Sequence, residues 1–178
     1  LLPIHILWIN LVTDGLPVLA LASEPAERDL MKRMPRSPNE SIFSHGMWQH
    51  MVWVGLLIGS LSVLSQAWAY KKGVDNWQTI LFTVLTFCQL AHALAIHSES
   101  ESLFKIGLLS NPPLIAAVTI TIGLQICVIY IPFFNNIFKT SPLSIMELSL
   151  CLVLPIMVFF GVELEKMFVR KGFIYQAA

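Results

Sequence analysis

Charged side chains are scarce in this chain of 178 residues, and long stretches have none. Only 12% of the residues are Asp, Glu, Lys or Arg, whereas 56% are hydrophobic. The intervals 41–70, 76–98 and 106–138 contain none of the four charged residue types. Each interval is long enough to cross a bilayer, which takes about 20 apolar residues. The composition therefore excludes a soluble globular domain and indicates an integral membrane protein.

Excess charge and clustered cysteines are also lacking. The 11 basic and 11 acidic residues cancel to a formal net charge of zero, which argues against a nucleic-acid-binding surface. Cys88, Cys127 and Cys151 lie in apolar stretches without CxxC spacing, so we expect neither a disulfide framework nor a thiolate metal site. The histidines show no HxxxH or HExxH spacing, which argues against a transition-metal site.

Five apolar stretches have the length of a transmembrane helix. Glu147 and Glu163 bracket the last stretch and are expected at the membrane interfaces. The chain begins inside the first stretch, without Met, a basic segment or a signal cleavage site, so we expect a fragment of a longer protein. We predict an all-α, polytopic membrane helix bundle whose spans cover about residues 1–22, 47–69, 77–97, 112–133 and 143–162.

Basic residues are distributed unevenly between the two sides of the membrane. Because the number of spans is odd, the two ends of the chain lie on opposite sides, and parity assigns each loop to one side. The positive-inside rule then places the loops Ser23–His45 and His97–Asn111 and the C-terminus in the cytoplasm. The cytoplasmic set is Arg28, Lys32, Arg33, Arg36, Lys105, Lys166, Arg170 and Lys171, and the opposite set is Lys71, Lys72 and Lys139.

Asp14 is the only formally charged residue in the first span. A carboxylate near mid-membrane costs about 2.5–3.5 kcal/mol on the insertion scale, so it needs compensation. Asn10, Thr13 and Asp14 follow an i, i+3, i+4 spacing, which places an amide, a hydroxyl and a carboxylate on one face of an α-helix. These oxygen ligands are the type that a hard cation such as calcium takes, and we predict a cation site here.

The backbone beside this cluster is predicted to be irregular. Gly15 is a poor helix former, and Pro17 lacks the N–H that would bond the carbonyl of Thr13. We predict that the first span is discontinuous near Asp14–Pro17, with the freed carbonyl lining an ion path. The alternative is a proline kink in which Asp14 is neutral or paired with a neighbouring helix.

Other polar residues within the spans are weaker candidates. Gln89 and His92 lie one turn apart in the third span, where they either face the oxygen cluster or hydrogen-bond between helices. Gln66, Thr121 and Gln125 are expected to bond neighbouring helices or to lie near an interface.

The strings LWINLVTDGLP at residues 7–17, EP at 24–25 and RDLMKR at 28–33 resemble one region of a known family. That region is the sixth transmembrane helix and following cytoplasmic loop of P-type calcium-transporting ATPases, most closely the bacterial and sarco/endoplasmic reticulum pumps. The remaining four spans have a similar hydropathy layout. The resemblance implies that residues 1–178 are helices six to ten of the transport domain of an ATP-driven translocase that exports calcium from the cytosol.

The resemblance also implies roles for individual residues. Asn10, Thr13 and Asp14 match calcium ligands of the family, and Gln89 stands where reticulum pumps have a ligating glutamate on the eighth helix. A second calcium ion needs further carboxylate charge nearby, so the loss of that glutamate predicts one calcium per transport cycle.

The surroundings of the chain follow from the same resemblance. Calcium is the transported ion, and ATP and magnesium are bound elsewhere in the parent enzyme, since these residues contain no DKTG phosphorylation motif. The expected partners are the lipid bilayer and the other domains of the pump, with no nucleic acid, in a bacterial plasma membrane. Manganese accepts the same oxygen ligands as calcium. A secondary cation transporter and a purely structural helix bundle also remain open alternatives.

Overall fold

A computed structural model describes residues 1–23, 46–97, 111–171 and 174, and the regular elements in this part of the chain are all helices. The predicted all-α bundle with five membrane spans is confirmed. The sequence predictions that concern residues 24–45 and 98–110 lie outside the described residues. The helices long and apolar enough to cross a membrane are Pro3–Ala22, Met47–Lys71, Trp77–Ala95, Pro112–Tyr130 and Ile145–Arg170.

The first span contains three elements, and each other span is one helix. In chain order the elements are α1 (Pro3–Trp8), the π-helix η1 (Ile9–Asp14), α2 (Gly15–Ala22), α3 (Met47–Lys71), α4 (Trp77–Ala95), α6 (Pro112–Tyr130), the short helix α7 (Pro132–Phe138) and α8 (Ile145–Arg170).

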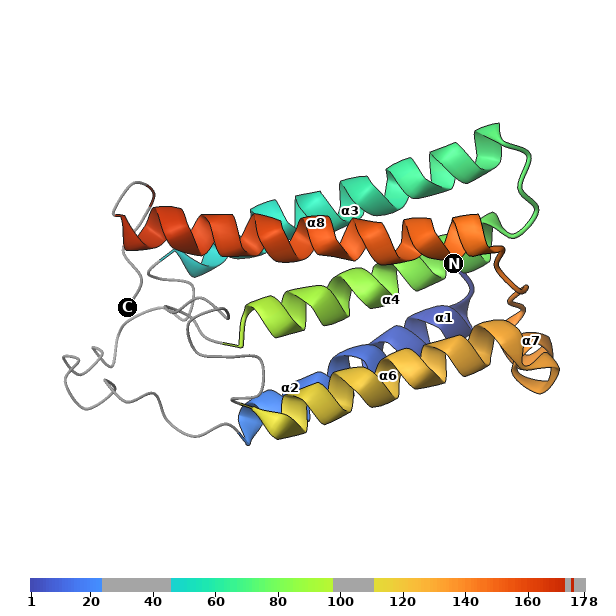
Figure 1. The fold of residues 1–178 in the computed structure, drawn as a ribbon, viewed down its shortest axis with the longest axis horizontal. Helices are drawn as coiled ribbons and strands as arrows, with labels where there is room; N and C mark the ends of the chain where they lie inside the picture. The colour runs from blue at the N-terminus through green and yellow to red at the C-terminus, as the bar shows by residue number, and fades with distance from the viewer. Residues whose placement is uncertain (24–45, 98–110, 172–173, 175–178) are drawn as a thin grey trace.

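Helix α4 lies at the centre of the bundle, between a layer formed by α3 and α8 and a layer formed by α1, α2 and α6 (Figure 1). In α4, 67% of the membrane-spanning window is buried, whereas no other span exceeds 33%. Its side chains Ile80, Phe82 and Val84 have no exposed surface. Ile80 and Val84 belong to a cluster with residues of both layers, and Phe82 packs with residues of the first span, α6 and α7. Polar residues of α4 are therefore placed to meet partners from either layer.

Two helices begin with side-chain caps at points where the chain turns back. Asn111 Oδ1 accepts the backbone N–H of Leu114 at 2.9 Å, and a proline occupies the first turn of α6. Ser144 and Glu147 form a capping box at the start of α8. The caps satisfy backbone N–H groups that have no partner within the helix.

Helix α8 continues past Val162, where the predicted last span ends, to Arg170. The sequence analysis stopped there because charged residues follow. Those residues are buried, however, since Glu163, Glu165 and Lys166 are 8%, 8% and 7% exposed. Glu163 is therefore buried within the bundle, its position at a membrane interface stays a prediction, and the helix is longer than its apolar run.

Partners within α8 and on other helices explain how α8 accommodates these charged residues. Lys166 Nζ lies 3.3 Å from Glu163 Oε1 and also donates to the backbone carbonyl of Ala95 on α4. Glu165 Oε2 lies 2.6 Å from His50 Nδ1 on α3. Buried charges are tolerated when they are paired and hydrogen-bonded. The partners come from the packing of the helices and are not visible in the sequence pattern.

The ends of the spans fall into two groups. In Figure 1, the end of α2, the start of α3, the end of α4, the start of α6 and the end of α8 lie at one end of the bundle. The turn between α3 and α4, helix α7 and the first residues of α1 lie at the other. The alternation of the spans is therefore as predicted by parity.

Candidate functional site

The first span departs from α-helical geometry at the predicted oxygen cluster. Residues Ile9–Asp14 form a π-helix, while the flanking Trp8 and Gly15 keep right-handed helical backbone angles. Pro17 is buried near the start of α2. The predicted irregularity beside Asp14 is therefore present, but it is a widened turn that ends at Asp14 and leaves the chain helical.

The π-helix separates the predicted ligands by burial. Thr13 is 2% exposed, whereas Asn10 is exposed and Asp14 is half-buried. Hydrogen bonding from i to i+5 places more residues in each turn than an α-helix does, so Thr13 is rotated away from Asn10. The expectation of one common helical face is corrected in this respect, because Thr13 faces the bundle and Asn10 faces away from it.

Two of these polar groups have no partner in the described part of the chain. The Thr13 hydroxyl oxygen is buried and makes no hydrogen bond. The Asp14 carboxylate forms neither a hydrogen bond nor an ion pair with any described residue. If Asp14 is ionised, the proline-kink alternative requires a partner for it on a neighbouring helix. No described residue provides that partner.

Helix α4 adds two more buried oxygens without partners. The amide Oε1 of Gln89 is buried and makes no hydrogen bond, and the same holds for the hydroxyl of Thr86, one turn earlier. The π-helix packs against α4, so both segments with unsatisfied oxygens are neighbours. The sequence analysis missed Thr86, although its position three residues before Gln89 places both on one side of α4.

This arrangement suits a cation better than it suits helix packing alone. A buried hydroxyl or amide without a hydrogen bond costs about 1–3 kcal/mol. Thr13, Thr86 and Gln89 are all in that condition, and Asp14 is the only carboxylate in the first or third span. Hard cations such as calcium coordinate hydroxyl, amide and carboxylate oxygens, so the donor set fits such an ion.

The remaining polar candidates lie in hydrogen bonds elsewhere. His92 Nε2 lies 3.1 Å from His50 Nε2, so its ring is engaged with α3. Gln125 bonds Trp8 and Thr83 on two other helices, which confirms the prediction of an interhelical role. Thr121 shows no bond to another described helix, because its hydroxyl donates to the carbonyl of Ala117 in its own helix, and a position near an interface stays a prediction. The role of Gln66 stays a prediction.

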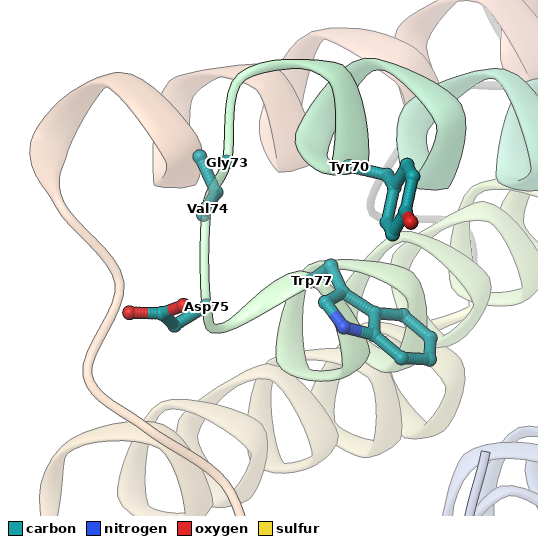
Figure 2. Close-up of a pocket in the computed structure, with 5 residues that line it drawn as sticks. All are labelled: Tyr70, Gly73, Val74, Asp75 and Trp77. Carbon is teal, nitrogen blue, oxygen red and sulfur yellow. The ribbon is translucent and has the colours of Figure 1, made fainter.

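A pocket of about 190 Å³ lies at the turn between α3 and α4 (Figure 2). The rings of Tyr70 and Trp77 lie across the opening from the backbone of the turn, and the Asp75 carboxylate points away from both rings. Amphipathic aromatic residues are typical of the membrane interface. None of the predicted ligands lines this pocket, which is lined by Tyr70, Gly73, Val74, Asp75 and Trp77.

Comparison with known sequences identifies the family of the chain. Residues 1–168 match the family described as cation transporting ATPase, C-terminus. The chain is 42% identical to a calcium-transporting ATPase of Bacillus subtilis over 81% of its length, and 35% identical to one of Bacillus cereus over 86%. A calcium-transporting ATPase of Saccharomyces cerevisiae is 34% identical over 94% of the chain.

The matched segment is a small part of each relative. The chain spans 16%, 19% and 18% of the B. subtilis, B. cereus and S. cerevisiae proteins, respectively. Each of these proteins is therefore several times longer than the region described here. The family match, by contrast, covers almost the whole chain and agrees with its five apolar helices. The chain belongs to the cation-transporting ATPase family, of which it is a C-terminal, membrane-spanning region.

Proposed function

We propose that this chain forms part of the ion path of an ATP-driven pump that exports calcium from the cytosol. The relatives named above are calcium-transporting ATPases, which supports calcium as the transported ion. The two Bacillus proteins support a bacterial plasma membrane as the location. ATP and magnesium act in other domains of the whole pump, because this chain contains no phosphorylation motif.

The proposed ligands are Asn10, Thr13 and Asp14 of the first span and Gln89 of α4. The observation that carries this assignment is the pair of buried, unsatisfied oxygens on Thr13 and Gln89, which belong to elements in contact. Calcium takes six to eight oxygen ligands in total, so these residues supply part of a shell. Helices of the pump that cover the exposed side of Asn10 would supply the rest.

The proposed mechanism depends on the charge of the Asp14 carboxylate. Ionised and without a cation, the carboxylate is costly at membrane depth, whereas a bound calcium ion offsets that cost. Phosphorylation elsewhere in the pump would shift the helices and change the side from which Asp14 and Thr13 are reached. Release then requires that the oxygens move apart, which lowers the affinity for calcium on the outward side.

A secondary transporter is the main alternative. The irregular first span is the feature that favours this alternative. Secondary transporters of this kind have a second interrupted helix in a matching position. The other four described spans are continuous α-helices, so this pattern is not repeated in the described residues. The family match also supports the pump.

Transport by the purified full-length pump in sealed vesicles tests this proposal. We expect accumulation of radioactive calcium that requires ATP and that persists when ion gradients are collapsed. Accumulation driven by a sodium or proton gradient without ATP would favour the secondary transporter. Uptake of manganese but not calcium would overturn the choice of ion while leaving the pump intact.

A further inference from the structure

Gln125 on α6 joins three helices through its side-chain amide. The indole Nε1 of Trp8 on α1 donates to Gln125 Oε1 at 2.9 Å. The amide Nε2 of Gln125 donates to the hydroxyl oxygen of Thr83 on α4 at 3.4 Å. Gln125 has no exposed surface, so water does not compete for either bond.

The chemistry of the partners fixes the orientation of this amide. The indole of Trp8 has a donor and no acceptor, so it selects the carbonyl oxygen of Gln125. The amide nitrogen must then point to Thr83, whose hydroxyl accepts. Reversal of the amide would place two donors together at Trp8, and the bridge therefore has one arrangement.

The bridge connects corresponding points on the two segments that carry the proposed ligands. The first span and α4 run in the same direction through the bundle (Figure 1). Trp8 lies six residues before Asp14, and Thr83 lies six residues before Gln89. Six residues of α-helix rise about 9 Å, so Gln89 lies about that far along the axis beyond the bridge. Asp14 lies beyond Trp8 in the same direction.

The N-terminal half of the first span has a second point of attachment to the bundle. His5 has no exposed surface, its Nε2 lies 2.6 Å from the carbonyl oxygen of Phe138, and its ring stacks on Phe82 with centroids 4.4 Å apart. Trp8 packs edge-on against Phe138 at 5.0 Å. The segment before the π-helix is thus fixed to α4 and α7, and Gln125 is its polar attachment nearest the ligands.

We infer that Gln125 is a positioning residue for the transported ion, because its amide sets the depth of Asp14 relative to Gln89. This inference rests on the proposed function of those two residues. Each hydrogen bond constrains one partner along the helix axis, and together they hold the two ligand segments in one register. Loss of the bridge lets the first span shift against α4, which misplaces oxygens that must converge on one ion.

The test compares calcium affinity with maximal rate in the full-length pump. Gln125→Leu keeps the approximate size of the side chain and removes both hydrogen bonds. We expect the calcium concentration for half-maximal ATP hydrolysis to rise about three- to tenfold, the size of one or two buried hydrogen bonds, with the maximal rate little changed. An unchanged calcium dependence in the folded Gln125→Leu pump would overturn the inference.

Thr121→Val provides the matched control. Thr121 lies one turn before Gln125, has no exposed surface, and bonds only the carbonyl of Ala117 in its own helix. We expect its calcium dependence to equal that of the wild type. A shift as large as that of Gln125→Leu would show that any polar loss in α6 has this effect, and would also overturn the inference.

If Gln125→Leu does not fold, two other variants test the same inference. Trp8→Phe and Thr83→Val each remove one end of the bridge with little change of shape, and each should raise the half-maximal calcium concentration. In a Gln125→Leu pump that does fold, Trp8→Phe should add no further shift, because both substitutions remove the same bond. Wild-type calcium dependence in both single variants would overturn the inference.

Failure of this inference is distinguishable from failure of the proposed function. If Asp14→Asn abolishes the calcium response and the bridge variants do not alter it, only the role of Gln125 is wrong. If Asp14→Asn retains the wild-type calcium response, the ion site itself is misassigned, and the inference falls with it.

Discussion

The imidazole Nδ1 of His50 on α3 lies 2.6 Å from a carboxylate oxygen of Glu165 on α8, 115 residues away in the sequence. The other ring nitrogen of His50 lies 3.1 Å from Nε2 of His92 on α4. Such a pair of ring nitrogens hydrogen-bonds only when one carries a proton and the other accepts it. The ring of His50 therefore connects three helices, at the end of the bundle where α8 extends beyond its apolar segment.

Glu165→Gln is expected to lower the free energy of unfolding of the pump by about 1–3 kcal/mol. The amide can still accept a hydrogen bond from His50, but the bond is no longer charge-assisted. Thermal unfolding of the purified pump in detergent measures the effect. Asp75→Asn is the control, because Asp75 is exposed at the α3–α4 turn. Equal losses in the two variants would contradict the assigned role of Glu165.

Asp14→Asn is expected to abolish calcium-dependent phosphorylation of the full-length pump without unfolding it. The substitution removes the one carboxylate of the proposed site and leaves its size unchanged. Asn10→Ala removes a neutral ligand from an exposed position, so it should weaken calcium affinity less. The measurement is phosphoenzyme formed at graded calcium concentrations. Near wild-type affinity in Asp14→Asn would refute the assignment.

Gln89 is expected to limit the pump to one calcium ion per cycle. Two divalent ions close together need more negative charge than Asp14 alone provides in these spans. Gln89→Glu should partly restore a second ion if the other ligands are present, whereas Gln89→Ala should weaken the remaining site by the loss of one neutral ligand. Equilibrium binding of radioactive calcium, counted per phosphorylation site, decides the number. A value of two in the wild type would show that this reasoning is wrong.

The side of the membrane on which the loops lie is expected to follow the basic residues. A cysteine at Asn39 should react with an impermeant reagent only after the cells are opened. A cysteine at Asp75, in the turn at the opposite end of the bundle, should react in intact cells and serves as the control. Labelling of the Asn39 position from outside would reverse the proposed orientation.

The spans could be predicted from the sequence because a bilayer requires each to be a long, uncharged run. Asn10, Thr13 and Asp14 could also be proposed as ligands from the sequence, since an acid in an apolar helix is rare and its polar neighbours are visible in the spacing. The proposal that Gln89 is a ligand needed the resemblance to a family, because a single glutamine in a helix is ordinary by itself.

The sequence by itself determined which of the described segments are long and apolar enough to cross a membrane, since hydropathy acts on each segment independently of its neighbours. Only the tertiary structure decided which oxygens are left unsatisfied and how far α8 extends. Lys166 and Glu165 can be buried because Ala95 and His50, on other helices, meet them. Likewise Gln125 bridges Trp8 and Thr83 across three helices. These contacts join residues distant in the chain, and no local pattern specifies which helix faces will meet.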